Sequence, residues 1–112
     1  MTILDTLIAA EVRRGLTPVP RSRPQWITYA ITAAARAFYV DSKDIPSPKR
    51  DPDSVDARHV AAWVMRQRDM SYPQIGRALN RDHTTIIYGC RRVDGDDRLR
   101  YIAERITSDG GV

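Results

Sequence analysis

The sequence has little of what several classes of protein require. It contains a single cysteine, Cys90, so no internal disulfide can form, and the chain suits a reducing compartment such as the cytoplasm. No apolar run approaches the roughly 20 residues that cross a bilayer. The N-terminal stretch MTILDTLIAAEVRRG has an acidic residue among its apolar residues and no basic residue before them, so we expect no secretory signal peptide.

The patterns of common enzyme and metal sites are also missing. No glycine fits the motif GxxxxGK(S/T), so we expect no nucleotide-binding loop. His83 and Cys90 are seven residues apart, roughly 10 Å along a helix, which is too far for a nucleophile to hydrogen-bond its base. These two residues and His59 do not form a zinc-binding pattern. We therefore expect a protein that is not an enzyme and that uses no cofactor or metal.

What the chain has in excess is basic charge. Its 112 residues, enough for one domain with one core, carry 18 basic and 14 acidic side chains, a net charge of +4. Residues 49–93 hold nine basic and five acidic side chains, whereas residues 94–112 hold three basic and five acidic ones. Positive charge concentrated in one part of a chain suits a polyanionic partner such as DNA.

Apolar residues recur at helical spacing through most of the chain, and no stretch alternates with the period of a strand. Prolines interrupt this pattern at 17–24 and 46–52, where they exclude a helix interior. The sequence therefore predicts an all-α domain of about five to six helices over residues 26–107, with an N-terminal extension (1–25) and a flexible tail (108–112). The expected helical segments are 2–14, about 24–38, a single turn at 41–45, 54–68, 71–80, 83–93 and a helix from 96 onward.

Short polar side chains are placed to cap four of these helices. The expected cap residues are Asp53 or Ser54, then Ser71, Asp82 and Asp96. Trp26 fits either the core or a contact with the N-terminal segment. The apolar side chains expected to face inward are Ile27, Ala30, Ile31, Ala34, Phe38, Val55, Val60, Trp63, Val64, Ile75, Ala78, Leu79, Leu99, Ile102, Ala103 and Ile106.

Two short helices joined by a tight turn, at 71–80 and 83–93, form a helix-turn-helix pattern. At 100° per residue the second helix has one side that faces the core, made by Ile86, Gly89, Cys90 and Val93. We therefore expect Cys90 to be a small core residue. The opposite side carries Thr84, Tyr88, Arg91 and Arg92, with His83 and Ile87 at its margin.

The segment RDHTT (81–85), at the start of the second helix, has side chains that can read base edges. An aspartate accepts a hydrogen bond from cytosine N4, and a threonine methyl packs on the thymine methyl. Arg81 before the helix and the arginine pair at its end can attract phosphates. Asp82 is also an ordinary N-cap residue, so capping and base contact both stay open for it.

The stretch SYPQIGRALNRDHTTIIYGCRRV (71–93) closely resembles the C-terminal DNA-binding domain of the bacterial replication initiator DnaA. The likeness extends upstream to ITAAARAFYVDSKDIPSPKR and ARHVAAW, and it covers roughly residues 27–106. The resemblance implies a Trp-repressor-like helical fold that binds double-stranded DNA. It implies base contacts in the major groove from Asp82, His83, Thr84 and Thr85, a further contact from Pro73, and phosphate contacts from Arg81, Arg91 and Arg92. The expected DNA-binding set also includes Arg50, Ser71 and Tyr88.

Two features depart from the family pattern. The family has one more residue between the helices, often as part of a Gly-Gly pair. This chain has only Asn80 before Arg81. The shorter turn would change the tilt of the second helix. The family also inserts an arginine from its basic loop into the minor groove, and the position that aligns with it here is Asp56. Either Lys49 or Arg50 then reaches the groove instead, or that contact is lost.

The expected function is sequence-specific binding of double-stranded DNA at DnaA-box-like sites. Because no ATPase motif is present, the expected role is that of a small transcription regulator, or of a competitor of an initiator in DNA replication. The alternative is a protein-interaction module that binds a replication or transcription protein. Residues 1–25 lie outside the resemblance, and they either pack on the domain, pair two chains into a homodimer or bind a protein partner.

Overall fold

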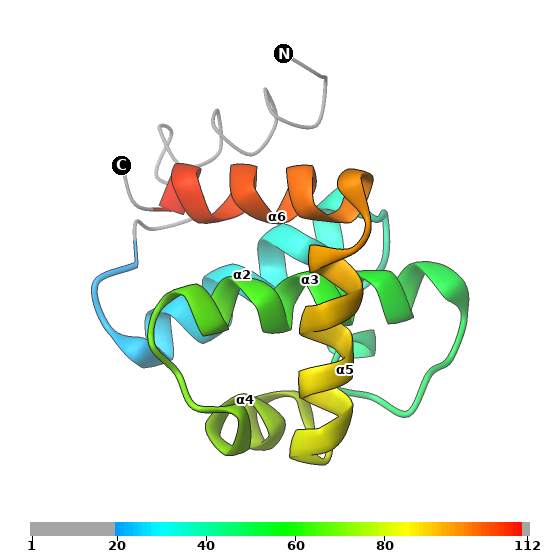
Figure 1. The fold of residues 1–112 in the computed structure, drawn as a ribbon, viewed down its shortest axis with the longest axis horizontal. Helices are drawn as coiled ribbons and strands as arrows, with labels where there is room; N and C mark the ends of the chain where they lie inside the picture. Colours follow the sequence, from blue (N-terminus) through cyan, green and yellow to red (C-terminus); the bar gives the residue numbers. More distant parts are fainter. Residues whose placement is uncertain (1–19, 111–112) are drawn as a thin grey trace.

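The computed structural model describes residues 20–110, and these form five α-helices and one short 3₁₀ helix (Figure 1). They confirm the all-α class. The helix expected at 2–14 and the contacts expected of residues 1–19 lie outside the described residues. Over the described range, no helix is both long and apolar enough to span a bilayer. The elements are α2 (Arg23–Ala37), η1 (Ser42–Asp44), α3 (Pro52–Gln67), α4 (Tyr72–Leu79), α5 (His83–Asp94) and α6 (Asp97–Gly110).

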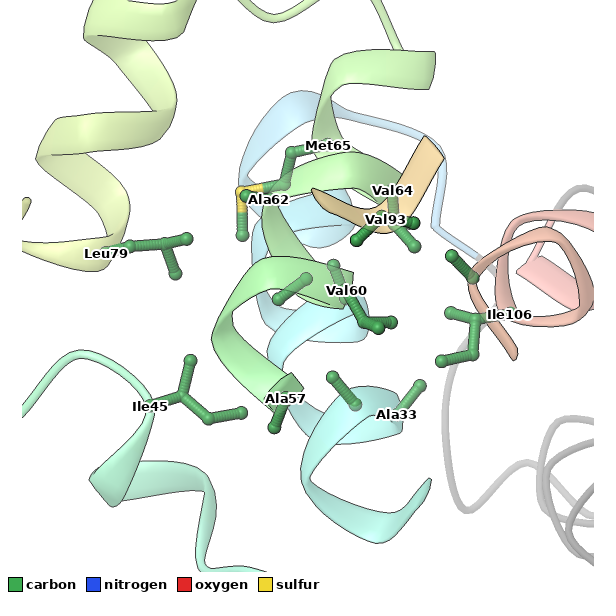
Figure 2. Packing of buried hydrophobic residues seen from close by; sticks show 14 of the residues in the cluster. Ala33, Ile45, Ala57, Val60, Ala62, Val64, Met65, Leu79, Val93 and Ile106 are labelled. Carbon is green, nitrogen blue, oxygen red and sulfur yellow. The ribbon is translucent and has the colours of Figure 1, made fainter. Parts of the chain in front are cut away.

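The central helix of the domain is α3, because α2, α5 and α6 all pack against it. Val60 and Val64 of α3 are completely buried, and they share one hydrophobic core with Val93 of α5 and Ile106 of α6 (Figure 2). In Figure 1, α4 and the first turns of α5 lie together at the end of the molecule opposite α6. The helix-turn-helix therefore forms one end of the domain, and its inner side packs against α3.

The start of α3 differs from the sequence prediction. Asp51 is the N-cap, and its carboxylate accepts a hydrogen bond from the backbone N–H of Ser54 at 3.1 Å. The prediction of Asp53 or Ser54 was wrong because Pro52 can take the first helical position, where the missing N–H of a proline costs nothing. Ser54 lies buried inside the helix instead of capping it.

The three later caps are confirmed. Ser71 Oγ accepts from the backbone N–H of Gln74 at 3.2 Å, and the Gln74 side chain accepts from the backbone N–H of Ser71 at 2.8 Å, which makes a capping box. Asp82 caps α5. Asp96 accepts from the backbone N–H of Leu99 at 3.1 Å in the first turn of α6. These caps fix where α4, α5 and α6 begin.

The predicted apolar stripes are confirmed: the side chains at the centre of each stripe are buried, and those at its edges are only partly buried. Trp26 belongs to the core, together with Tyr29, which the spacing did not single out and whose hydroxyl donates to the carbonyl of Ile106 at 2.8 Å. Helix α6 continues to Gly110, which packs against both rings, so residues 108–110 are helical instead of starting a flexible tail. The stripe residues that are only partly buried are Ile27, Ile31, Val55, Trp63, Ala78 and Ile102.

Candidate nucleic-acid interface

The turn between α4 and α5 is three residues long and closely packed. Asn80 has φ 55° and ψ 49°, the left-handed conformation that asparagine tolerates better than most residues. The N–H of Arg81 then donates to the carbonyl of Gly76 at 2.8 Å. A Cβ atom at Gly76 would lie 2.5 Å from the Arg81 carbonyl oxygen, so only glycine fits there. The shorter turn is therefore closed by one left-handed asparagine and by close backbone contact with α4.

Helix α5 has the orientation that its sequence predicts. Its buried residues are the four expected ones, and Cys90 is only 5% exposed. Burial raises the pKa of the Cys90 thiol to about 11, as suits a core residue. A Cβ atom at Gly89 would lie 2.4 Å from Nδ1 of His59, so α5 contacts α3 very closely at this point. Burial also lowers the pKa of His59.

The side chains expected to read bases lie together at the start of α5, and all four are exposed: Asp82, His83, Thr84 and Thr85. The Asp82 carboxylate accepts hydrogen bonds from the backbone N–H of Thr84, at 3.4 Å, and from the Thr84 hydroxyl. His83 Nδ1 lies 3.5 Å from the other carboxylate oxygen. The hydrogen bond from Thr84 lowers the pKa of Asp82, so this carboxyl is ionised at neutral pH. The structure confirms the capping role of Asp82.

An open hollow joins the start of α5 to α4. It brings Pro73 beside Arg81, Asp82 and His83, although Pro73 is ten residues away from His83 in sequence. Gly76, Arg77 and Asn80 complete its lining. The sequence analysis did not single out Arg77, which stands on the exposed side of α4.

The far end of α5 carries three exposed side chains, Tyr88, Arg91 and Arg92, around a second shallow hollow. Tyr88 is 62% exposed, which is unusual for a large aromatic residue. Neither arginine side chain makes an ion pair with any residue from 20 to 110. Their charges are therefore available to an anionic partner.

Two arginines hold the loop that precedes α3, and sequence reasoning missed this arrangement. Arg58 of α3 is only 6% exposed. Its guanidinium donates to the carbonyls of Ile45 at 2.6 Å, Lys49 at 2.9 Å and Ser47 at 3.2 Å, and to that of Asp44 at 3.3 Å. Burial lowers the pKa of Arg58, and the nearby positive charge of Arg81 lowers it further.

Arg81 connects the same loop to the helix-turn-helix. Its guanidinium donates to the carbonyl of Ser47 and also, at 3.0 Å and 3.3 Å, to the carbonyls of Asn80 and Leu79 at the end of α4. Arg58 and Arg81 thus meet at one carbonyl oxygen, that of Ser47. We call Arg58, Ser47 and Arg81 the loop clamp. It sets the position of residues 45–50 relative to the start of α5.

The loop itself carries two exposed cations with different partners. Lys49 Nζ lies 3.2 Å from the Asp44 carboxylate, and the hydrogen bond to Asp44 raises the pKa of Lys49. Arg50 is exposed, and its side chain makes no hydrogen bond or ion pair within the described part of the chain. Asp56 lies on α3, outside the loop, and pairs with Arg98 of α6 at 3.3 Å. An aspartate held in this ion pair cannot supply the minor-groove contact that the family makes with an arginine.

Comparison with known proteins identifies the family. The family model described as the bacterial DnaA protein helix-turn-helix matches residues 27–93. The chain is also 40% identical, over 104 residues, to the chromosomal replication initiator protein DnaA of Roseiflexus castenholzii. That match covers 87% of this chain but only 20% of the relative, so the chain spans about a fifth of that protein's length. The chain belongs to the family of bacterial DnaA helix-turn-helix domains, which bind DNA.

Proposed function

We propose that the protein binds double-stranded DNA at DnaA-box-like sequences, with the start of α5 in the major groove. The observation that carries this proposal is the exposed row of short polar side chains from Asp82 to Thr85 at the outer end of the domain. Short side chains let a helix approach base edges closely. The relative from Roseiflexus castenholzii is named a chromosomal replication initiator, which supports a role in replication.

The start of α5 is organised before DNA binds. The hydrogen bond between the Thr84 hydroxyl and Asp82 restricts both side chains, so less conformational entropy is lost on binding. An ionised carboxylate has about four acceptor sites, and Asp82 can therefore cap α5 and still accept from a cytosine N4 amine. His83 and Thr85 stand beside it as further base contacts. Pro73 lines the same hollow and would contact the DNA from α4.

Phosphates are the proposed partners of the exposed cations around this helix. Arg91 and Arg92 would bind them at the far end of α5, with Tyr88 beside them. At the N-terminus of α4 the capping box uses the backbone N–H groups of Ser71 and Gln74, and Pro73 has none, so the proposed phosphate contact there is made by the Ser71 hydroxyl. Arg81 has donors on its guanidinium but uses several of them in the loop clamp. Its proposed phosphate contact is therefore secondary to its role in the turn.

We propose Arg50 as the side chain that enters the minor groove. Lys49 is occupied by Asp44, whereas Arg50 has no partner among residues 20–110. Arginine is also the residue favoured by the negative potential of a narrow minor groove. The loop clamp supports this role because it holds the loop at a fixed distance from the helix that reads the major groove.

At the level of the cell, we propose that the protein occupies DnaA boxes as a transcription regulator or as a competitor of an initiator. Its 112 residues contain the helix-turn-helix module but no GxxxxGK(S/T) motif. A helix-turn-helix domain bound to a box would keep an initiator from occupying that box. Reporter transcription and origin firing, measured with and without the protein, distinguish the two roles.

Fluorescence anisotropy tests the proposal directly. The protein is titrated onto a labelled duplex that carries a DnaA box and onto a scrambled duplex of the same composition. We expect His83→Ala to cost about 1–3 kcal/mol on the box and little on the scrambled duplex. We expect Arg91→Gln, the matched loss of a phosphate contact, to weaken both duplexes by the same factor. Identical behaviour of the two variants on both duplexes would refute base reading by α5, and no binding to either duplex would favour the protein-interaction alternative.

A further inference from the structure

A groove separate from the two hollows described above lies beside the helix-turn-helix, between the start of α2 and α4. Its volume is about 400 Å³. In Figure 1 the first turn of α2, in blue, lies on the same side of the molecule as α4. Two arginines stand among mainly apolar residues in its lining, which includes Arg23, Pro24, Ile27, Met70, Arg77 and Ala78. We call this feature the α2–α4 groove.

Both arginines of the α2–α4 groove are exposed and have unused charge. Neither the Arg23 nor the Arg77 side chain makes a hydrogen bond or ion pair in the portion of the chain described, and no carboxylate lines the groove. Arg23 occupies the first position of α2, where the helix macrodipole disfavours a cation, and the first turn has no acidic residue to offset it. Helix stability therefore does not explain an arginine at position 23.

The groove continues the proposed DNA interface. Arg77 lines the α2–α4 groove and also the hollow that contains Pro73 and His83. A duplex held by the start of α5 would thus lie next to Arg77, and Arg23 would stand one step farther from α5. Two arginines that are unpaired among the described residues, in a groove without a carboxylate, suit a polyanion such as the DNA backbone.

We propose that the α2–α4 groove binds the sugar–phosphate backbone of the DNA that flanks the box. Arg23 and Arg77 bind phosphates, and the partly exposed side chains of Ile27 and Ala78 pack against deoxyribose carbons. An acidic protein segment would match the charge as well, but continuity with the hollow at the start of α5 favours DNA. The inference rests on the proposed function, since it extends the contact with the same duplex. A backbone contact of this kind adds affinity for DNA but does not discriminate between base sequences.

The test is the salt dependence of DNA binding. Anisotropy titrations at several salt concentrations compare the wild type with Arg23→Gln, Arg77→Gln and the double variant, on a duplex with the box at its centre and long flanks. We expect each substitution to reduce the slope of log K against log salt by about 0.9, the value for one lost phosphate contact. Box and scrambled duplexes should weaken by the same factor. Thermal melting confirms that each variant is folded.

A matched control and a truncated duplex sharpen the result. Arg98→Gln also removes one exposed cation, but Arg98 pairs with Asp56 and lines neither the α2–α4 groove nor the hollow at the start of α5, so its slope should equal that of the wild type. Removing the flank from one side of the box should abolish the difference between wild type and variants, whereas removing the other flank should preserve it.

The inference and the proposed function fail in different ways. Slopes of the Arg23 and Arg77 variants that match the wild type, while the wild type still prefers the box, would overturn the inference. Equal binding of the wild type to box and scrambled duplexes would instead refute sequence reading. In that case a reduced slope for the variants would still support a backbone contact in the α2–α4 groove.

Discussion

Replacing Arg58 by methionine tests how the loop clamp contributes to stability and to DNA binding. Methionine keeps much of the length of the side chain but removes the hydrogen bonds to the carbonyls of residues 44–49. Hydrogen bonds to a charged group contribute about 1.5–3 kcal/mol each, so the two shortest, to Ile45 and Lys49, together contribute about 3–6 kcal/mol. The variant also avoids burying a guanidinium, which recovers a few kcal/mol.

The expected net loss is therefore about 1–3 kcal/mol of unfolding free energy. For a domain of this size each kcal/mol shifts the melting temperature by about 4–8 °C, so circular dichroism should show a drop of at least about 4 °C. The control is Arg98→Met, which breaks an ion pair with Asp56 and a distant contact with the Phe38 ring, and should cost less than about 1 kcal/mol. An Arg58→Met protein that melts like the wild type would refute the clamp as a stabilising feature.

The DNA-binding consequence is measured below the melting transition of the variant. If Arg58 acts by positioning the loop, Arg58→Met and Arg50→Ala should each weaken binding to the box. The affinity of the double variant should then be close to that of whichever single variant binds more weakly. Such coupling is the signature of residues that share one interaction. Fully additive effects in anisotropy titrations would show that Arg58 does not position Arg50.

Two further predictions concern the packing behind the interface. Gly76→Ala places a Cβ atom 2.5 Å from the carbonyl oxygen of Arg81. We therefore expect urea unfolding to show a loss of about 1–3 kcal/mol of unfolding free energy, together with weaker DNA binding. Wild-type values for both would contradict the close packing of the turn. Burial lowers the pKa of His59 below its ordinary 6.5, so the unfolded chain takes up this proton first and stability should fall as the pH drops below about 6.5. Melting curves between pH 7.5 and 5.5 should show a smaller fall for His59→Gln than for the wild type, and an equal fall would rule out His59 as the cause.

The start of α3 illustrates where sequence reasoning about local structure fails. The three later caps were predicted correctly because each lies just before an apolar stripe, and the hydrogen bonds of a cap span only two or three residues. Asp51 has the same chemistry, but Pro52 behind it was taken as a break. Proline excludes the interior of a helix and suits its first position, so the same residue supports two opposite predictions.

The residues around the loop show pairings that sequence reasoning did not predict. Asp56, which aligns with the family's minor-groove arginine, pairs with Arg98, 42 residues away in sequence. The identity of the exposed loop cation depended on Asp44 taking Lys49 as its partner. Neither pairing follows from the spacing of residues along the chain.

The sequence by itself determined the helices, the inward face of α5, the exposed segment from Asp82 to Thr85 and the family. These depend on helical periodicity, on caps and on a contiguous motif, all of which act within a few residues along the chain. Only the tertiary structure decided that Arg58 and Arg81 meet at the carbonyl of Ser47, 34 residues from Arg81, and that Arg23 and Arg77 line one groove. Those arrangements depend on how α2, α3 and α4 pack, because packing brings together side chains whose separation in sequence carries no information about their distance in space.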